Sequence, residues 1–163
     1  MENAIIVQEL IHTMSKKKGK GGVIAIKLDL EKAYDCLEWS FIRDTMNHYK
    51  FLSHLVFLIM SCVSTSSVSI LVNEGALEPF YPSKGIRQGD PLSPYLFFLY
   101  MEVLRALIVD KCQAKLWNPV KASQNGLVFS FLFFFADDLM LFAKVDRKNY
   151  IAIRDVLDSF YEI

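Results

Sequence analysis

The hydrophobic positions of this chain follow helical spacing in some segments and form strand-like runs in others. Apolar residues three and four positions apart predict helices, and short β-branched runs predict strands. Helices are expected at Ile5–Met14, Ser40–Tyr49, Ser53–Val63, from Asp90 to about Lys115, and at Arg147–Tyr161. The run Val23–Asp29 predicts a strand that ends on an acid, and Glu31–Trp39 is expected to form a turn or a short helix.

Turn-forming and helix-capping residues separate these segments. Asn73-Glu74-Gly75 lies between the runs Ser66–Val72 and Ala76–Tyr81, which predicts a β-hairpin. Three helices are led by residues suited to capping, namely Ser40, Ser53, and Asp90 followed by Pro91. Helices mixed with antiparallel hairpins indicate the α+β class, with helices packed on one face of a sheet.

Two adjacent acids, Asp137 and Asp138, interrupt the apolar segment Phe131–Phe142. Two apolar strands joined by a tight turn would carry both carboxylates to the tip of a buried hairpin, where like charges without a cation are costly. A divalent ion that prefers oxygen ligands, such as magnesium, would offset that cost. A polar turn between two hydrophobic strands fits the same pattern, so the residues alone leave both interpretations open.

Asp29, at the end of the predicted strand, is the candidate partner of this acidic pair. A strand-terminal Asp is often only a turn former, and it could equally face the Asp137-Asp138 turn across a sheet. Carboxylates from two separate segments can hold two metal ions for phosphoryl transfer. One ion then activates the attacking hydroxyl, the other stabilises the leaving oxygen, and both neutralise charge on the phosphate.

The polar loop Gly85–Pro94 and the aromatic Tyr34 complete the candidate chemistry. Glycines allow a backbone to approach a ligand closely, and the helix N-terminus that follows favours anions. Arg87 could hold phosphate and Gln88 could contact a base or a backbone. An ordinary loop before a capped helix explains Asp90 but not Arg87 and Gln88. Tyr34 could lie beside a bound sugar, or it could pack in the core with its hydroxyl group hydrogen-bonded.

The composition of the chain limits the possible classes of protein but does not identify a function. The chain has 163 residues, is 53% hydrophobic and has a formal net charge of zero, which fits one domain and gives no global attraction for nucleic acid. Cys36, Cys62 and Cys112 lack paired metal-ligand spacing, so reduced intracellular thiols are expected. The longest apolar runs, Leu55–Val63 and Val128–Ala136, are too short to span a bilayer, and the polar first residues are unlike a secretory signal.

Three motifs, in order along the chain, resemble those of the reverse transcriptases of plant LINE-type, non-LTR retrotransposons. Lys27–Asp35 resembles the first catalytic palm motif, Gly85–Pro94 the template- and nucleotide-positioning motif, and Phe135–Asp138 the polymerase Asp-Asp hairpin. The resemblance covers almost the whole chain, and the ordered set is far more specific than any single motif.

The resemblance implies one partial domain over residues 1–163, a right-hand polymerase palm with part of the fingers. The palm is an antiparallel sheet with helices packed on one face. Fingers elements would be about 1–22 and 53–84, and palm elements about 23–52 and 85–163, with no thumb. The implied reaction is DNA synthesis on an RNA template from a DNA primer and deoxynucleoside triphosphates. Magnesium would be the cofactor, with manganese as a substitute.

Residue by residue, the resemblance places the metal ions and the catalytic centre on three acids. Asp29, Asp137 and Asp138 would be the catalytic metal ligands. The backbone carbonyl of Leu30 would also touch the nucleotide-bound metal, and Lys27 is a candidate phosphate contact.

The resemblance also assigns the residues around the incoming nucleotide. Tyr34 would exclude the ribose 2′-hydroxyl, the group that distinguishes RNA from DNA precursors. Arg87, Gln88 and Gly89 would line the nucleotide and template pocket.

The chain departs from the family pattern in two respects. The run Phe133–Phe135 is one residue too long, and an inserted residue reverses the faces of a strand unless a bulge absorbs it. We expect that bulge between Ser130 and Phe133. The resemblance also implies that the thumb, the remaining fingers and the endonuclease segments of a parent element are not among these residues. A palm without a thumb is expected to hold primer and template poorly, because phosphate contacts supply most non-specific affinity.

Three functions therefore compete at this point. The first is an RNA-directed DNA polymerase, the second an inactive relic or nucleic-acid-binding remnant that retains the palm fold, and the third an unrelated two-metal phosphohydrolase. Metal- and template-dependent nucleotide incorporation separates them. A nuclear location follows from the resemblance alone, and no association with membranes is expected.

Overall fold

The computed structural model describes most of the chain as two compact units. The described residues are 7, 8, 11, 12, 14, 15, 22–30, 32–73, 75–121, 128–133 and 138–162. Within them, side chains are not described for Lys121, Val128, Phe129, Phe131–Phe133 and Asp138. The first unit is Met1–Glu31 with Glu102–Ile163, and the second is Lys32–Met101. These units differ from the predicted division into fingers and palm, which stays a prediction.

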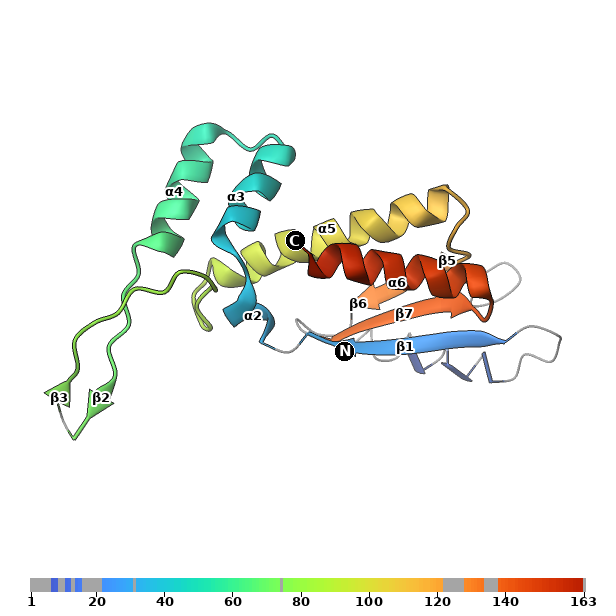
Figure 1. Cartoon of the computed structure of the whole chain (residues 1–163), viewed down its shortest axis with the longest axis horizontal. Coiled ribbons are helices and arrows are strands. Elements are labelled where there is room, and N and C mark those ends of the chain that lie inside the picture. The colour runs from blue at the N-terminus through green and yellow to red at the C-terminus, as the bar shows by residue number, and fades with distance from the viewer. Residues whose placement is uncertain are drawn as a thin grey trace. The chain divides into compact units, whose positions relative to one another are not determined.

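A three-stranded antiparallel sheet forms the centre of the first unit (Figure 1). Its strands, in spatial order, are β1 (Val23–Asp29), β7 (Asp138–Lys144) and β6 (Phe131–Phe133). Strand β7 lies in the middle and pairs with β1 along its whole length, from Lys144 opposite Val23 to Asp138 opposite Asp29. The predicted strand and the predicted Phe-rich hairpin are both present, and they form one sheet.

The other elements are helices and two short strand pairs. The helices are α2 (Ala33–Cys36), α3 (Trp39–His48), α4 (Ser53–Ser64), α5 (Ser93–Gln113) and α6 (Arg147–Tyr161). The strand pairs are β2 (Leu71–Val72) with β3 (Gly75–Ala76), and β4 (Val120–Lys121) with β5 (Val128–Phe129). The described residues between 7 and 15 are helical, as the sequence predicts. Within the described part of the chain, no helix has both the length and the hydrophobicity that a membrane span requires.

Side chains from both faces of the central sheet are buried. Met140 and Phe142 pack in one cluster with Val7 and Val120. The alternate residues of β7 point to the opposite face, and they are also completely buried: Leu139, Leu141 and Ala143. Figure 1 shows α6 and the adjoining part of α5 on one side of this sheet. The predicted α+β class is confirmed, and the central strand β7 is buried on both faces at Leu139–Ala143.

A buried asparagine ties the start of α6 to the end of β7. Asn149 is 1% exposed, and its Oδ1 accepts a hydrogen bond from the backbone N–H of Asn118 at 2.6 Å. Its Nδ2 donates to the carbonyl oxygen of Lys144 at 3.0 Å and to Asp146 at 2.7 Å. Asp146 caps the helix by accepting from the Asn149 backbone N–H at 2.7 Å. One side chain therefore satisfies polar groups of three segments.

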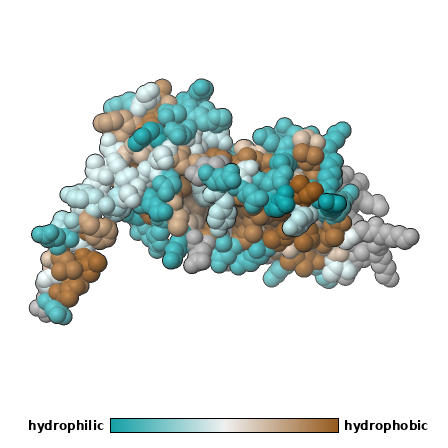
Figure 2. Space-filling model, in the orientation of Figure 1, coloured by the Kyte–Doolittle hydropathy of each residue, from teal (hydrophilic) through white to brown (hydrophobic). Residues whose placement is uncertain are grey.

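The second unit contains a paired helix hairpin and a β-hairpin arm. Helices α3 and α4 contact one another, and the arm, which we define as Val68–Phe80, follows α4. Val68 bridges Phe80 within the arm, and β2 pairs with β3 near its tip, so the predicted hairpin is confirmed. Apolar side chains of the arm are exposed, as the brown surface in Figure 2 shows.

Two helix caps predicted from the sequence are wrong. Helix α3 begins at Trp39, so Ser40 lies inside it, and α4 begins at Ser53 itself. The residues at the cap positions are Glu38 and Leu52, and neither makes a side-chain capping bond. Ser capping is a local preference of about 1 kcal/mol, which packing of the apolar helix faces can override.

The bulge predicted between Ser130 and Phe133 is also wrong. Phe131–Phe133 pair with β7 in unbroken register, and Ser130 continues that register by accepting a hydrogen bond from the Phe142 N–H at 2.8 Å. The chain instead changes partners at Ser130, because the preceding strand β5 pairs with β4. The additional residue is therefore not absorbed within this paired stretch.

Replacing Asn149 with Ala is expected to lower the free energy of unfolding by about 2 kcal/mol, because it leaves the Asn118 N–H and the Lys144 carbonyl without their partner. Denaturant unfolding measures this loss. The matched control is Lys148→Ala, an exposed position in the same helical turn, which should change stability by less than about 0.5 kcal/mol. Equal stability of the two variants would contradict the account of this network.

Candidate active site

The adjoining ends of β1 and β7 bring two of the predicted acids together. Asp29 is the last residue of β1 and is exposed, and Asp138 is the first residue of β7. The register places their backbones directly opposite one another. Like charges at directly opposed positions of antiparallel strands repel, so this pairing is unfavourable unless a cation is present. The backbone of one member of the acidic pair, Asp138, thus lies opposite Asp29, and a shared metal site stays a prediction.

Two other predicted contacts of the metal site, Leu30 and Lys27, are close to Asp29 along β1. Leu30 follows Asp29 directly, and Lys27 is exposed on the same face of β1 because strand residues alternate. Asp137 and the side chain of Asp138 lie outside the described residues. Among the described side chains, no group of three Asp, Glu, His or Cys residues could hold a metal ion. Two of the three predicted ligands are not among those side chains. Carboxylate oxygens with one backbone carbonyl suit a hard divalent ion.

Tyr34 is held in an aromatic cluster of the second unit. It lies in α2, is half-buried, and stacks on Phe97 of α5 with ring centroids 5.0 Å apart and planes inclined by 13°. Phe97 also meets Tyr100, which contacts Phe41 edge to face. The stack fixes the plane of the Tyr34 ring. Tyr34 therefore packs against other aromatic rings, as one interpretation predicted, and keeps part of its surface accessible, as the other requires.

The loop that precedes α5 carries the predicted nucleotide- and template-binding residues. Arg87, Gln88 and Gly89 are all exposed. Gly85 and Gly89 both have a φ angle of 85°, a conformation that side chains disfavour. At Gly85 a Cβ atom would also lie 2.9 Å from the carbonyl oxygen of Asp35. At Gly85 the close approach is to another segment of this unit, so the approach to a ligand stays a prediction.

Asp90 ends this loop by capping the turn before α5. Its Oδ1 accepts a hydrogen bond from the Leu92 N–H at 2.8 Å, as the sequence predicted for a capping Asp. The helix begins slightly later than expected, at Ser93, and ends at Gln113 rather than near Lys115.

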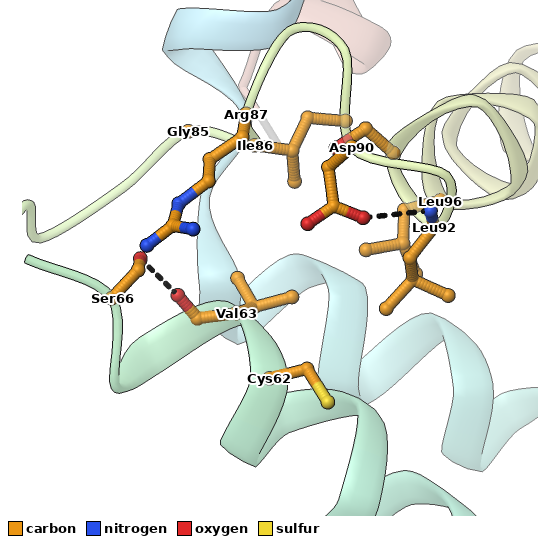
Figure 3. A pocket seen from close by; sticks show the side chains of 10 residues that line it. Cys62, Val63, Ser66, Gly85, Ile86, Arg87, Asp90, Leu92 and Leu96 are labelled. Carbon is orange, nitrogen blue, oxygen red and sulfur yellow. Dashed lines mark hydrogen bonds between the residues drawn. The ribbon is translucent and has the colours of Figure 1, made fainter.

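A small pocket lies between this loop and α4. Its volume of about 20 Å³ suits roughly one water molecule. Figure 3 shows the side chains of Arg87 and Asp90 extending from the loop toward α4, where Cys62 and Val63 lie. Gln88 and Gly89 do not line it. This pocket is much too small for a nucleotide, since ligand sites typically measure about 300–1,000 Å³.

Sequence reasoning missed two residues that contact this loop. Trp39 donates its indole N–H to the carbonyl oxygen of Gly85 at 2.7 Å, and Glu38 forms an ion pair with Lys84 at 3.6 Å. A partly buried indole N–H usually finds an acceptor. This acceptor is 46 positions further along the chain, so the sequence offers no means of naming it.

The three cysteines are free thiols. Burial raises the pKa of the Cys112 thiol, and a hydrogen bond with the Ser130 side chain opposes that shift. The thiol of Cys112 is therefore protonated at neutral pH and is a poor nucleophile.

Comparison with known proteins gives consistent matches along nearly the whole chain. The family described as "Reverse transcriptase (RNA-dependent DNA polymerase)" matches residues 3–162. The retrovirus-related Pol polyprotein from type-2 retrotransposable element R2DM of Drosophila melanogaster is 32% identical over 157 residues, which are 96% of this chain and 14% of that protein. The retrovirus-related Pol polyprotein from type-1 retrotransposable element R2 of Nasonia vitripennis is 36% identical over 144 residues, which are 88% of this chain and 13% of that protein.

A vertebrate relative is similar to this chain over a comparable stretch. The transposon TX1 uncharacterized 149 kDa protein of Xenopus laevis is 24% identical over 143 residues, which are 88% of this chain and 10% of that protein. The chain thus spans only a small part of the length of these relatives. The matches establish that it belongs to the reverse transcriptase family, as a domain of the kind found in the polyproteins of non-LTR retrotransposons.

Proposed function

We propose that this chain is an RNA-directed DNA polymerase domain that transfers nucleotides from deoxynucleoside triphosphates to the 3′-hydroxyl of a primer. Reverse transcriptases copy an RNA template from a primer and generally use divalent metal ions. One observation carries the proposal for this chain: the register sets Asp29 opposite Asp138 at the adjoining ends of β1 and β7. That arrangement suits two segments that share a metal site.

In this proposal three acids and one backbone carbonyl supply the metal ligands. Asp29, Asp137 and Asp138 would hold two magnesium ions through their carboxylates, with the backbone carbonyl of Leu30 on the nucleotide side. When bound, these ions would favour deprotonation of the primer hydroxyl and neutralise charge on the triphosphate. Lys27, exposed on the same face of β1 as Asp29, is placed to attract phosphate.

Four other residues would select and hold the nucleotide in this proposal. The Tyr34 ring, fixed against Phe97, would exclude a ribose 2′-hydroxyl sterically. Exposed Arg87 would pair with phosphate, and Gln88 with Gly89 would contact the nucleotide and the template. Their exposure supports this role, because a ligand can reach them.

Replacing Asp29 or Asp137 with Asn is expected to reduce primer extension on an RNA template by at least about 100-fold, since each change removes a charged metal ligand worth several kcal/mol. Extension with magnesium and deoxynucleotides, measured on a sequencing gel, checks this. Asp110→Asn is the matched control, because it removes an exposed carboxylate from α5 and should leave the rate unchanged.

Three outcomes of that assay decide the proposal. Extension that requires template and magnesium and is lost in both site variants supports it. No extension by folded wild-type protein contradicts it for this chain and favours a nucleic-acid-binding remnant. Release of monophosphates without template dependence would identify a phosphohydrolase instead.

Replacing Tyr34 with Ala is expected to raise the use of ribonucleotides relative to deoxynucleotides by about 10–100-fold, the range that the loss of a steric contact allows. Tyr34→Phe keeps the ring that stacks on Phe97 and should retain wild-type discrimination. Single-nucleotide incorporation with matched dNTP and rNTP measures both ratios. Unchanged discrimination in the Ala variant would remove Tyr34 from the proposed role.

A further inference from the structure

The loop before α5 is joined by its backbone to the segment that carries Tyr34. The Gly85 N–H donates to the carbonyl oxygen of Leu37 at 2.8 Å, and the Ile86 N–H donates to the carbonyl oxygen of Tyr34 at 2.8 Å. Gly85 and Ile86, the two residues of the loop that donate these hydrogen bonds, come immediately before Arg87 in the sequence. The position of the Tyr34 backbone and the start of the Arg87–Gly89 stretch are therefore set by the same pair of hydrogen bonds.

Trp39 adds a third hydrogen bond to this junction, at the carbonyl group of Gly85. Its indole N–H donates to the Gly85 carbonyl oxygen at 2.7 Å, so both the N–H and the C=O of Gly85 are bound to the segment Tyr34–Trp39. The two backbones lie so close that a Cβ atom on Gly85 would be 2.9 Å from the Asp35 carbonyl oxygen. We name this junction, formed by Tyr34–Trp39 with Gly85–Ile86, the clamp.

The aromatic stack with Phe97 holds the side chain of Tyr34, while the clamp holds its backbone. The ring rests on Phe97, on α5 beyond the loop. A shift of Gly85 relative to Tyr34–Trp39 would therefore move the Tyr34 backbone while its ring is held against α5. Solvent screening leaves the ion pair between Glu38 and Lys84, both about half exposed, with little influence on this geometry. The indole hydrogen bond is the side-chain contact that fixes Gly85.

We propose that Trp39 is a positioning residue that holds the Tyr34 ring and the Arg87–Gly89 loop in one fixed arrangement, and thereby sets discrimination between deoxynucleotides and ribonucleotides. This inference rests on the proposed polymerase function. Trp39 touches no reacting group in this account; it acts through Gly85 and Tyr34. Its removal should alter selectivity and nucleotide KM more than kcat.

The chain offers a matched control because its second tryptophan makes the same kind of bond elsewhere. Trp117, in the first unit, donates its indole N–H to the carbonyl oxygen of Phe142 at 2.9 Å and is completely buried. Trp39→Phe and Trp117→Phe each keep a large aromatic ring and delete one indole hydrogen bond. Both lose stability, and the first alone should loosen the clamp.

The first readout is independent of activity. In Trp39→Phe, amide hydrogen exchange at Gly85 and Ile86 should accelerate by about fivefold or more, as expected when a supporting hydrogen bond is lost. In Trp117→Phe those two amides should exchange as in the wild type. Unchanged exchange in Trp39→Phe would overturn the inference, whether or not the chain extends a primer.

A second variant strains the clamp without touching Trp39. Gly85→Ala introduces the Cβ atom that meets the Asp35 carbonyl, whereas Gly89→Ala carries the same φ of 85° with no neighbour within 4 Å of the added atom. Gly85→Ala should accelerate exchange at Ile86 as Trp39→Phe does, and Gly89→Ala should not. This pair keeps the inference testable if Trp39→Phe fails to fold.

The second readout is nucleotide choice. Trp39→Phe and Gly85→Ala should each lower the ratio of deoxynucleotide to ribonucleotide incorporation by about three- to tenfold, mostly through KM, while Trp117→Phe keeps the wild-type ratio. Faster exchange with an unchanged ratio in an active enzyme would overturn the role of Trp39. A wild-type chain that fails to extend a primer would instead overturn the proposed function, and the exchange data would still decide whether the clamp exists.

Discussion

Antiparallel pairing between β1 and β7 is the constraint on which the first unit depends. It sets the positions of Asp29 and Asp138, and it determines which side chains of β7 enter each half of the core. A shift of one residue would exchange the two faces of the strand. Burial of both faces of β7 penalises such a shift, so the packed core also fixes the site at the end of the strands.

This constraint explains a local conflict in the fold. Opposing two acids across a strand pair is unfavourable by the rules that govern the rest of the sheet. Sequences depart from such rules mainly where function requires it. The second unit shows a related feature at Gly85, where a left-handed φ angle and two closely spaced backbones persist because three hydrogen bonds hold them.

The sequence predicted what local patterns encode. Hydrophobic periodicity and turn chemistry predicted the strand Val23–Asp29, the Phe-rich hairpin and the hydrogen bond by which Asp90 caps the turn before α5. The motifs identified the family. The sequence could not predict contacts between residues that are far apart along the chain. Examples are the hydrogen bonds of Trp39 with Gly85 and of Asn149 with Asn118, which only the folded chain creates. The bulge near Ser130 failed because the chain changes strand partners there, and counting residues cannot reveal such a change.

The paired acids at the ends of β1 and β7 are proposed to form a divalent-cation site. Thermal unfolding with and without magnesium tests it without requiring catalysis. Ligands that bind only the native state raise its stability with concentration, so magnesium should raise the Tm of the wild type and leave that of Asp29→Asn unchanged. Without magnesium the variant should be the more stable of the two, because it removes the repulsion. An equal response of both proteins to magnesium would contradict the account.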